Sequence, residues 1–175
     1  MVNKEVALII GAGDSLGSAV ARVFAKNNFT TVVARRNGDQ LNPLKKEIEK
    51  NGGQCFAFSL DARKEEDVIN FIDKIESEIG EINVAVYNIG ANIRFNILET
   101  TSKKYYKVWE MATFGAFLMG REVTRKMMPR KKGTIIFTGA TASIRGKEGF
   151  AAFSGAKQAK RALAQSMAKE LAPKG

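Results

Sequence analysis

The sequence predicts an α/β protein built around one doubly wound parallel sheet. Short apolar runs alternate with amphipathic segments along the chain, and the apolar runs are nearly continuous instead of alternating with polar residues. Such strands are buried on both faces, as in parallel sheets that helices cover on each side. Right-handed crossovers then give the expected strand order 3-2-1-4-5. The length of 175 residues suits a single domain over residues 1–175.

The first half of the chain follows this alternation. In chain order we expect a strand at 5–10, a helix at 15–28, a strand at 30–34, a helix at 41–52 and a strand at 54–60. Leu16, Val20 and Phe24 recur at helical spacing in the first helix. The second helix has Pro43 in its first turn and Gly52 at its end, where proline and glycine are favoured.

The second half continues the same pattern. We expect a helix at 68–79, a strand at 83–88, a helix at 103–128, a strand at 133–138 and a helix at 149–171. The apolar stripe of the first of these helices stops at Gly80, and Pro129 closes the long one.

Composition narrows the class of partners and the compartment. The single cysteine, Cys55, excludes an internal disulfide, and no run approaches the ~20 apolar residues of a membrane span. A cytoplasmic protein with no membrane partner is expected. The net charge of +10 fits either a nucleic-acid surface or lysine-rich solvated helices. The basic residues are scattered, and the cluster at 125–132 lacks interleaved aromatic residues, which favours the second interpretation and predicts no nucleic-acid partner.

A glycine-rich loop joins the first strand to the first helix. It consists of Gly11, Ala12, Gly13, Asp14, Ser15, Leu16 and Gly17. Glycines allow a tight turn and a close backbone approach, and a helix N-terminus attracts a pyrophosphate. The strand before the loop and the helix after it make a dinucleotide site the favoured interpretation. The alternative is a glycine-rich turn without a ligand.

The end of the second strand indicates which dinucleotide binds. An acidic residue there would hold the ribose 2′-hydroxyl of NAD, but the chain has Arg35 and Arg36. Guanidinium groups suit a 2′-phosphate through charged, often bidentate hydrogen bonds. NADP(H) is therefore favoured over NAD(H). The alternative is an arginine pair at the protein surface.

Together these features resemble the short-chain dehydrogenase/reductase family, and the resemblance covers essentially the whole chain. The family's TGxxxGxG loop corresponds to residues 10–17, with Ile10 in place of the threonine and Ser15 in place of the middle glycine. The resemblance implies a Rossmann-type fold and a nicotinamide cofactor.

Two more motifs carry this resemblance. The family's acidic residue after the third strand, which holds the adenine, corresponds to Asp61, followed by Ala62. The family's Asn-Asn-Ala-Gly segment corresponds to residues 87–90, which keep Asn88 and Gly90. The resemblance implies that Asn88 braces the central strand and that Gly90 lets the backbone approach the cofactor.

The catalytic positions of the family are mostly altered. The family uses Asn, Ser, Tyr and Lys, and these positions fall on Ala112, Ala140, Phe153 and Lys157. The resemblance implies that the tyrosine exchanges the proton, while the lysine lowers the tyrosine pKa and binds the nicotinamide ribose. Phe153 and Lys157 are spaced i, i+4 and share a helix face. A phenyl ring cannot donate a proton, so only Lys157 remains as a catalytic candidate.

Few other groups could replace the missing ones. The chain has no histidine, and no metal site is predicted. Hydroxyls such as that of Ser143 are weak acids near pH 7, and strand alternation points Tyr87 away from the face that Asn88 uses. Lys157 could itself donate a proton if burial and a nearby charge lowered its pKa. The alternative is that Lys157 only binds the ribose.

The resemblance also implies further C-terminal structure. Family members run to about 250 residues as one domain. The family's later strands and substrate lid would be missing from this chain, which is therefore expected to be a fragment or a short form. The helices at 103–128 and 149–171 carry more apolar residues than one sheet face needs. The family pairs these helices across a two-fold axis, so a homodimer or tetramer is expected.

Two functions remain open. One is an NADP(H)-dependent short-chain oxidoreductase with a non-standard or weakened active site. The other is a catalytically inactive NADP(H)-binding module or scaffold. The cofactor motifs fit both, whereas Ala112, Ala140 and Phe153 favour the second.

Overall fold

The structure, a computed structural model, describes residues 5–175, so residues 1–4 of the predicted domain lie outside the described part. A parallel sheet of five strands has the order β3-β2-β1-β4-β5, as the sequence predicts. The strands are β1 (Val6–Ile10), β2 (Thr30–Arg35), β3 (Gln54–Ser59), β4 (Ile82–Tyr87) and β5 (Thr134–Phe137). The order reverses between β1 and β4, and ligands of such sheets bind at the carboxyl ends of the strands beside this point.

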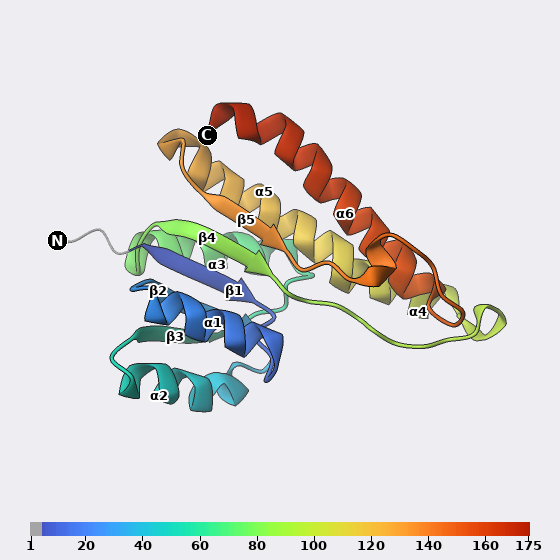
Figure 1. The fold of residues 1–175 in the computed structure, drawn as a ribbon, viewed down its shortest axis with the longest axis horizontal. Helices are drawn as coiled ribbons and strands as arrows, with labels where there is room; N and C mark the ends of the chain where they lie inside the picture. The colour runs from blue at the N-terminus through green and yellow to red at the C-terminus, as the bar shows by residue number, and fades with distance from the viewer. Residues whose placement is uncertain (1–4) are drawn as a thin grey trace.

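Helices cover both faces of the sheet (Figure 1). The helices are α1 (Leu16–Lys26), α2 (Asn42–Lys50), α3 (Glu65–Glu78), α4 (Ser102–Trp109), α5 (Gly115–Met127) and α6 (Ala151–Leu171). One face packs against α1 and α2 and the other against α3 and α5, while α6 lies along α5. The expected helices and strands are present, with ends that differ by a few residues.

The central strand explains why two separate cores form. Every residue of β1 is buried, and successive side chains point to opposite faces. Leu8 and Ile10 join the core beneath α3 and α5, whereas Ala7 and Ile9 join the core beneath α1 and α2. Ile9 pairs with Val33 of β2 and with its neighbour on β4, so the apolar layers continue across the sheet.

The expected helix at 103–128 is present as a continuous helical segment, but it contains a π turn that the sequence analysis did not foresee. A π-helical turn at Glu110–Phe114 separates α4 from α5. The buried Tyr87 hydroxyl donates a 2.7 Å hydrogen bond to the carbonyl of Met111, and Thr113 Oγ1 donates one of the same length to the carbonyl of Ala156. The first bond engages a carbonyl of the π turn and the second ties the turn to α6, so contacts with other elements support this irregular part of the helix.

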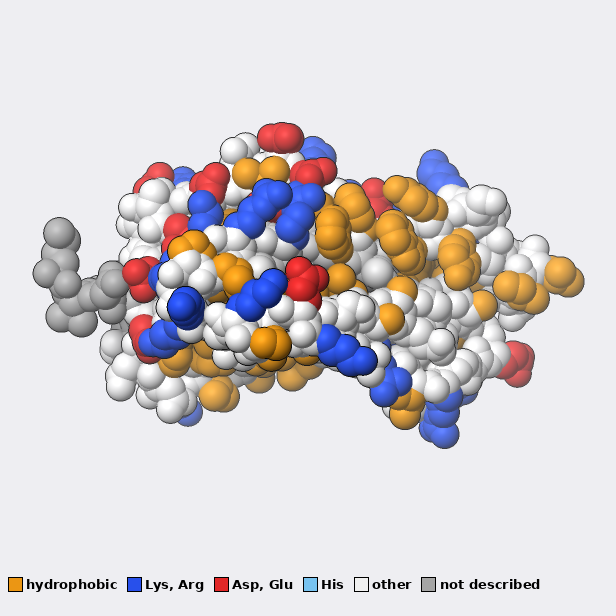
Figure 2. Space-filling model, turned by 90° about the horizontal axis from the view of Figure 1, so that it is seen from above, with side chains coloured by type: hydrophobic (Ala, Val, Ile, Leu, Met, Phe, Trp, Pro, Cys, Tyr) orange, Lys and Arg blue, Asp and Glu red, His pale blue; other side chains and the backbone are white. Residues whose placement is uncertain are grey.

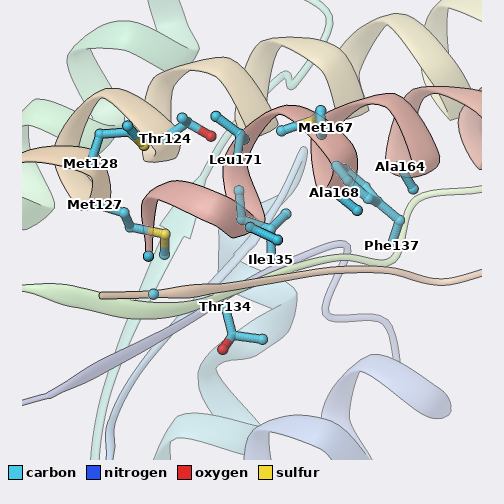
Figure 3. Close-up of a pocket in the computed structure, with 13 residues that line it drawn as sticks. Thr124, Met127, Met128, Thr134, Ile135, Phe137, Ala164, Met167, Ala168 and Leu171 are labelled. Carbon is cyan, nitrogen blue, oxygen red and sulfur yellow. The ribbon is translucent and has the colours of Figure 1, made fainter. Parts of the chain in front are cut away.

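An apolar pocket of about 280 Å³ lies at the far end of α6. Figure 3 shows Ile135 and Phe137 of β5 facing Met167 and Leu171 of α6 across this pocket. β5 is the last strand on this side of the described sheet. Over residues 5–175, no helix combines the length and hydrophobicity that a membrane crossing requires.

Candidate active site

The glycine-rich loop is built for close packing at one end and open space at the other. Gly11 has φ +89°, and a Cβ there would lie 2.9 Å from the backbone nitrogen of Ile89. A Cβ on Gly17 would lie 2.5 Å from the carbonyl oxygen of Gly11, so α1 can begin this close to β1 only with glycine. A Cβ on Gly13 would meet no atom within 4 Å, which leaves its backbone accessible to a ligand.

Side chains hold this loop in place. Asn88 Nδ2 donates a 3.0 Å hydrogen bond to the carbonyl of Gly11, which ties the end of β4 to the end of β1. Ser18 Oγ donates a 2.7 Å hydrogen bond to the carbonyl of Gly13. Ser15 precedes α1 and makes no side-chain capping bond; the N–H of Ser18 is bonded to the carbonyl of Gly13, which leaves the N–H groups before it, at the start of α1, for a ligand.

The loop and the arginine pair line a common groove of about 530 Å³. Its lining includes Gly11, Gly13, Arg35, Arg36, Asn88 and Gly90, together with Asn37, Gln40, Ile89 and Met111. The structure therefore brings six of the thirteen residues expected at a dinucleotide site into this groove, and Lys157 is not among its lining residues. Asp14, Ser15, Leu16 and Gly17 belong to the adjoining turn and helix start.

Arg35 is the better oriented of the two arginines. Its Nη1 donates a 3.2 Å hydrogen bond to Asp14 Oδ1 of the glycine-rich loop. The Asp14 side chain is 92% exposed, so this ion pair is weak and an incoming phosphate can compete with it. Arg36 is exposed.

Asp61 and Ala62 do not line this groove. The Asp61 carboxylate accepts hydrogen bonds of 2.8 and 2.6 Å from Nε and Nη2 of Arg63. These bonds lower the pKa of Asp61 below its usual range. Arg63 also pairs with Glu110 of the π turn at 3.5 Å, and Ala62 is buried beneath that turn. The sequence alone does not reveal that Arg63 forms this hydrogen-bonded ion pair with Asp61.

The altered catalytic positions meet where α6 packs on the π turn. Phe153, Ala112 and Ala156 belong to one buried apolar cluster, and Phe153 is 8% exposed. Ala140 is exposed at the end of β5, and its backbone N–H donates a 3.0 Å hydrogen bond to Oγ of the buried Ser143. Among these residues only Ser143 brings a hydroxyl.

Lys157 is held beside these positions. Its Nζ donates a 2.8 Å hydrogen bond to the carbonyl of Thr138 and lies 5.7 Å from the centroid of the Phe153 ring. A Cβ on Gly90 would lie 3.6 Å from Nζ of Lys157, so glycine keeps the groove open next to this amine. Burial lowers the pKa of Lys157 below the usual range of lysine.

A second lysine on the same helix was missed by the sequence analysis. Lys160 is 2% exposed, and its Nζ donates a 3.3 Å hydrogen bond to the carbonyl of Ile89. Burial and the charge of Lys157 lower the pKa of Lys160 to about 7. Its spacing from Lys157 was a signal in the sequence, because residues three apart on a helix lie on the same face.

A second hollow of about 290 Å³ opens next to Phe153, away from the glycine-rich loop. It is lined by Asn92, Thr141, Ala142, Arg145, Lys147, Phe150, Phe153 and Ser154. The groove and this hollow thus flank Gly90, Phe153 and Lys157, an arrangement that can place a cofactor against a second molecule.

The tyrosines are not catalytic replacements. Tyr87 is fully buried with its hydroxyl bonded to the π turn, and burial raises its pKa above the usual range. Tyr105 and Tyr106 are exposed on α4, as expected for packing or surface residues.

Comparison with known proteins agrees with this geometry. The family model for short chain dehydrogenases matches residues 5–175. The chain is 28% identical over 172 residues to a 2-dehydro-3-deoxy-D-gluconate 5-dehydrogenase of Formosa agariphila, and the match covers 98% of this chain and 65% of that enzyme. It is 27% identical to a human 3-oxoacyl-[acyl-carrier-protein] reductase, covering 97% of this chain and 70% of that enzyme. The chain thus spans about two thirds of the length of these relatives.

A solved structure shows the same fold at higher identity. A short-chain dehydrogenase from Rhodopseudomonas palustris superposes with a TM-score of 0.94 and 50% identity, covering 99% of this chain and 81% of that one. Because the family model matches nearly every described residue, this chain belongs to the short-chain dehydrogenase family.

Proposed function

We propose that this chain carries the cofactor site of an NADP(H)-dependent oxidoreductase whose proton-donating machinery is non-standard. The observation that carries the proposal is the groove in which Arg35 and Arg36 meet the glycine-rich loop. The family supplies oxidoreductase chemistry, and the two arginines supply the preference between cofactors.

The residues of the groove fit a dinucleotide phosphate. The uncapped start of α1 offers N–H donors for a pyrophosphate, and the open space beside Gly13 lets the ligand approach the loop. Arg35 stands at the end of β2, where no carboxylate is available for a ribose 2′-hydroxyl, and its guanidinium suits a 2′-phosphate. Lys157 would meet the nicotinamide ribose beside Gly90.

The bound cofactor would supply or accept a hydride, and the chain itself must handle the accompanying proton. Phe153 gives an apolar wall instead of a phenol, and Ala140 gives no hydroxyl for a substrate oxygen. Ser143 can hold an oxygen by a hydrogen bond, but its hydroxyl is a weak acid. Lys157 is thus the described group beside Phe153 that can carry a proton.

The second candidate function is a cofactor-binding module without turnover. Ala112, Ala140 and Phe153 favour it, since three polar groups of the family's site are absent. Both candidates require NADP(H) binding, and turnover separates them.

Cofactor titration tests the proposal. NADPH should bind more tightly than NADH by fluorescence titration, and Arg35→Ala should remove this preference. Loss of a charged hydrogen bond costs roughly 1.5–3 kcal/mol, which corresponds to about 10–10²-fold in Kd. Lys50→Ala, an exposed change at the end of α2, is the control and should bind like the parent. Equal NADPH and NADH affinities in the parent protein would refute the cofactor assignment.

We also propose that the chain pairs with a second copy of itself through α4, α5 and α6. Tyr106, Trp109, Phe114 and Phe117 form a continuous row with ring centroids 6.0, 5.9 and 6.1 Å apart. Tyr106 and Phe117 are exposed. Figure 2, which looks onto the side of α5 and α6, shows hydrophobic side chains gathered over one half of this face. A two-fold pairing would cover such a patch on both copies.

The oligomeric state tests this second proposal. Light scattering at micromolar concentration should give at least a dimer, and Phe117→Lys should shift the protein toward monomer. A parent that is monomeric at this concentration contradicts the pairing.

A further inference from the structure

Two lysines are buried together on one face of α6. Lys157 and Lys160 are 4% and 2% exposed, and their spacing of three residues puts them on the same side of the helix. Lysine is almost never this buried without a charged partner. The pair therefore needs an explanation beyond packing.

The groups around the two amines are carbonyls and aromatic rings. Lys157 donates to the carbonyl of Thr138 at 2.8 Å, and Lys160 donates to the carbonyl of Ile89 at 3.3 Å. The Lys160 ammonium also lies 5.5 Å from the centroid of the Tyr87 ring. Within the described residues, neither amine forms an ion pair with a carboxylate.

The acidic groups around Tyr87 are already engaged. Asp61, whose charge acts on Tyr87, and Glu110 both pair with Arg63. Tyr87 is held neutral by burial. The chain contains no histidine, so no imidazole shares the site. The charge of one lysine is thus felt mainly by the other.

Two ammonium groups facing each other in a dry site without a counter-ion are unstable together. Loss of one proton relieves the repulsion and leaves a lone pair on one amine, which accepts a hydrogen bond from the other. Burial lowers the pKa values of both lysines, and the charge of Lys157 lowers that of Lys160 further. The pair is then a coupled acid near neutral pH.

We propose that Lys157 and Lys160 share a single proton, and that this pair, with Lys160 as the positioning residue, supplies the proton that a phenol at position 153 would supply. The inference rests on the proposed oxidoreductase function. It gives a role to Lys160, a buried lysine to which the proposed cofactor site assigns none.

The proton balance is that of carbonyl reduction. A bound reduced cofactor would supply the hydride to the substrate carbonyl carbon, and the electrons of the C=O π bond would move to its oxygen. That oxygen takes a proton from the Lys157 ammonium, directly or through one water, so an N–H bond breaks and an O–H bond forms. Lys157 is left as a neutral amine, and solvent returns a proton to the pair.

The titration of the pair can be observed without turnover. In protein labelled with ¹³C,¹⁵N-lysine, the ε-carbon shifts are followed from about pH 5 to pH 11. We expect two linked lysines, assigned with Lys157→Met and Lys160→Met, that titrate below all the exposed lysines. In Lys160→Met the titration of Lys157 should move to lower pH, because the hydrogen bond with the Lys160 amine, which raises the pKa of Lys157, is gone. Lys169→Met, on an exposed part of the same helix, should leave it unchanged.

Turnover then tests the catalytic use of the pair. With NADPH and a panel of ketones and aldehydes, Lys160→Met should lower kcat about tenfold or more at neutral pH. It should leave the KM for NADPH unchanged and shift the pH profile by the amount measured in the lysine titration. A purely structural Lys160 would not move the pH profile.

The outcomes separate the two proposals. Buried lysines that titrate like exposed ones, or a Lys157 titration that Lys160→Met leaves unchanged, overturn the amine pair. A shifted titration with an unshifted pH profile overturns its role as proton source. If the two lysines titrate as the expected linked pair but the protein shows no turnover at any pH, the proposed function is refuted and, with it, the catalytic use of the pair. Lys160→Gln serves as a second variant should the methionine variant fold poorly.

Discussion

Replacing Lys160 with methionine should stabilise the protein, and the gain should depend on pH. Methionine keeps the length of the side chain but removes an amine that is buried without a carboxylate. A pKa lowered from 10.5 to about 7 corresponds to roughly 5 kcal/mol at about 1.4 kcal/mol per tenfold change. This figure is an upper limit, because the amine keeps a carbonyl and a ring as partners and part of the cost is shared with Lys157. We expect a gain of about 1–3 kcal/mol at pH 7.

The sign of the pH dependence follows from proton binding. Between about pH 7 and pH 10.5 the unfolded chain holds a proton on Lys160 that the folded chain has given up. The free energy of unfolding of the parent therefore gains a rising contribution with pH across this window. Below it the penalty is full and constant, and above it the penalty vanishes. Lys160→Met should be most advantageous at neutral and acid pH and lose its advantage as the pH approaches 10.5.

Urea unfolding measures this difference directly. The parent, Lys160→Met and the exposed control Lys169→Met are compared at several pH values, so that the titration of other groups cancels. A methionine variant less stable than the parent at pH 7 would contradict this reasoning. So would a stability difference that does not change between about pH 7 and pH 10.5, because it would mean that folding does not lower the pKa of Lys160.

Two further changes test the altered active site and the π turn. The double variant Phe153→Tyr, Ala140→Ser should gain NADPH-dependent carbonyl reduction, since it restores a phenol next to Lys157 and a hydroxyl for the substrate oxygen; a rate at or below that of the parent would mean that the phenol is not the limiting group. Gly115→Ala should lower the free energy of unfolding by about 1–3 kcal/mol, because its Cβ would overlap the Tyr87 hydroxyl where α5 begins; an unfolding midpoint equal to that of the parent would contradict this tight contact.

Much of the fold was predictable because its determinants are local. Continuous apolar runs identify buried strands, and β1 is buried along its entire length. Strand–helix alternation and handed crossovers then fix the order 3-2-1-4-5, which the structure confirms. The arrangement of the glycine-rich loop with Arg35 also follows, because β1 and β2 are neighbours and end at the same edge.

The features that the sequence did not reveal depend on contacts between distant segments. The π turn is supported by Tyr87, which lies 24 residues before Met111 and bonds the carbonyl of Met111. The ion pair between Asp61 and Arg63 depends on the conformation of the Arg63 side chain, and the spacing of two residues in the sequence does not determine that conformation. Lys160 is buried because its position on α6 faces the end of β4, although lysine residues usually favour the surface.

The loss of the phenol and the presence of the second lysine fit one physical account. In the family's arrangement the lysine stays charged, and its charge makes the neighbouring tyrosine more acidic. Here Phe153 removes the group that such a charge would act on and adds an apolar ring 5.7 Å from the Lys157 amine. Burial destabilises the Lys157 ammonium, the hydrogen bond with Lys160 offsets part of this effect, and the charge of Lys157 in turn lowers the pKa of Lys160. In our proposal the acidic proton that the family places on residue 153 is therefore held by the pair at residues 157 and 160.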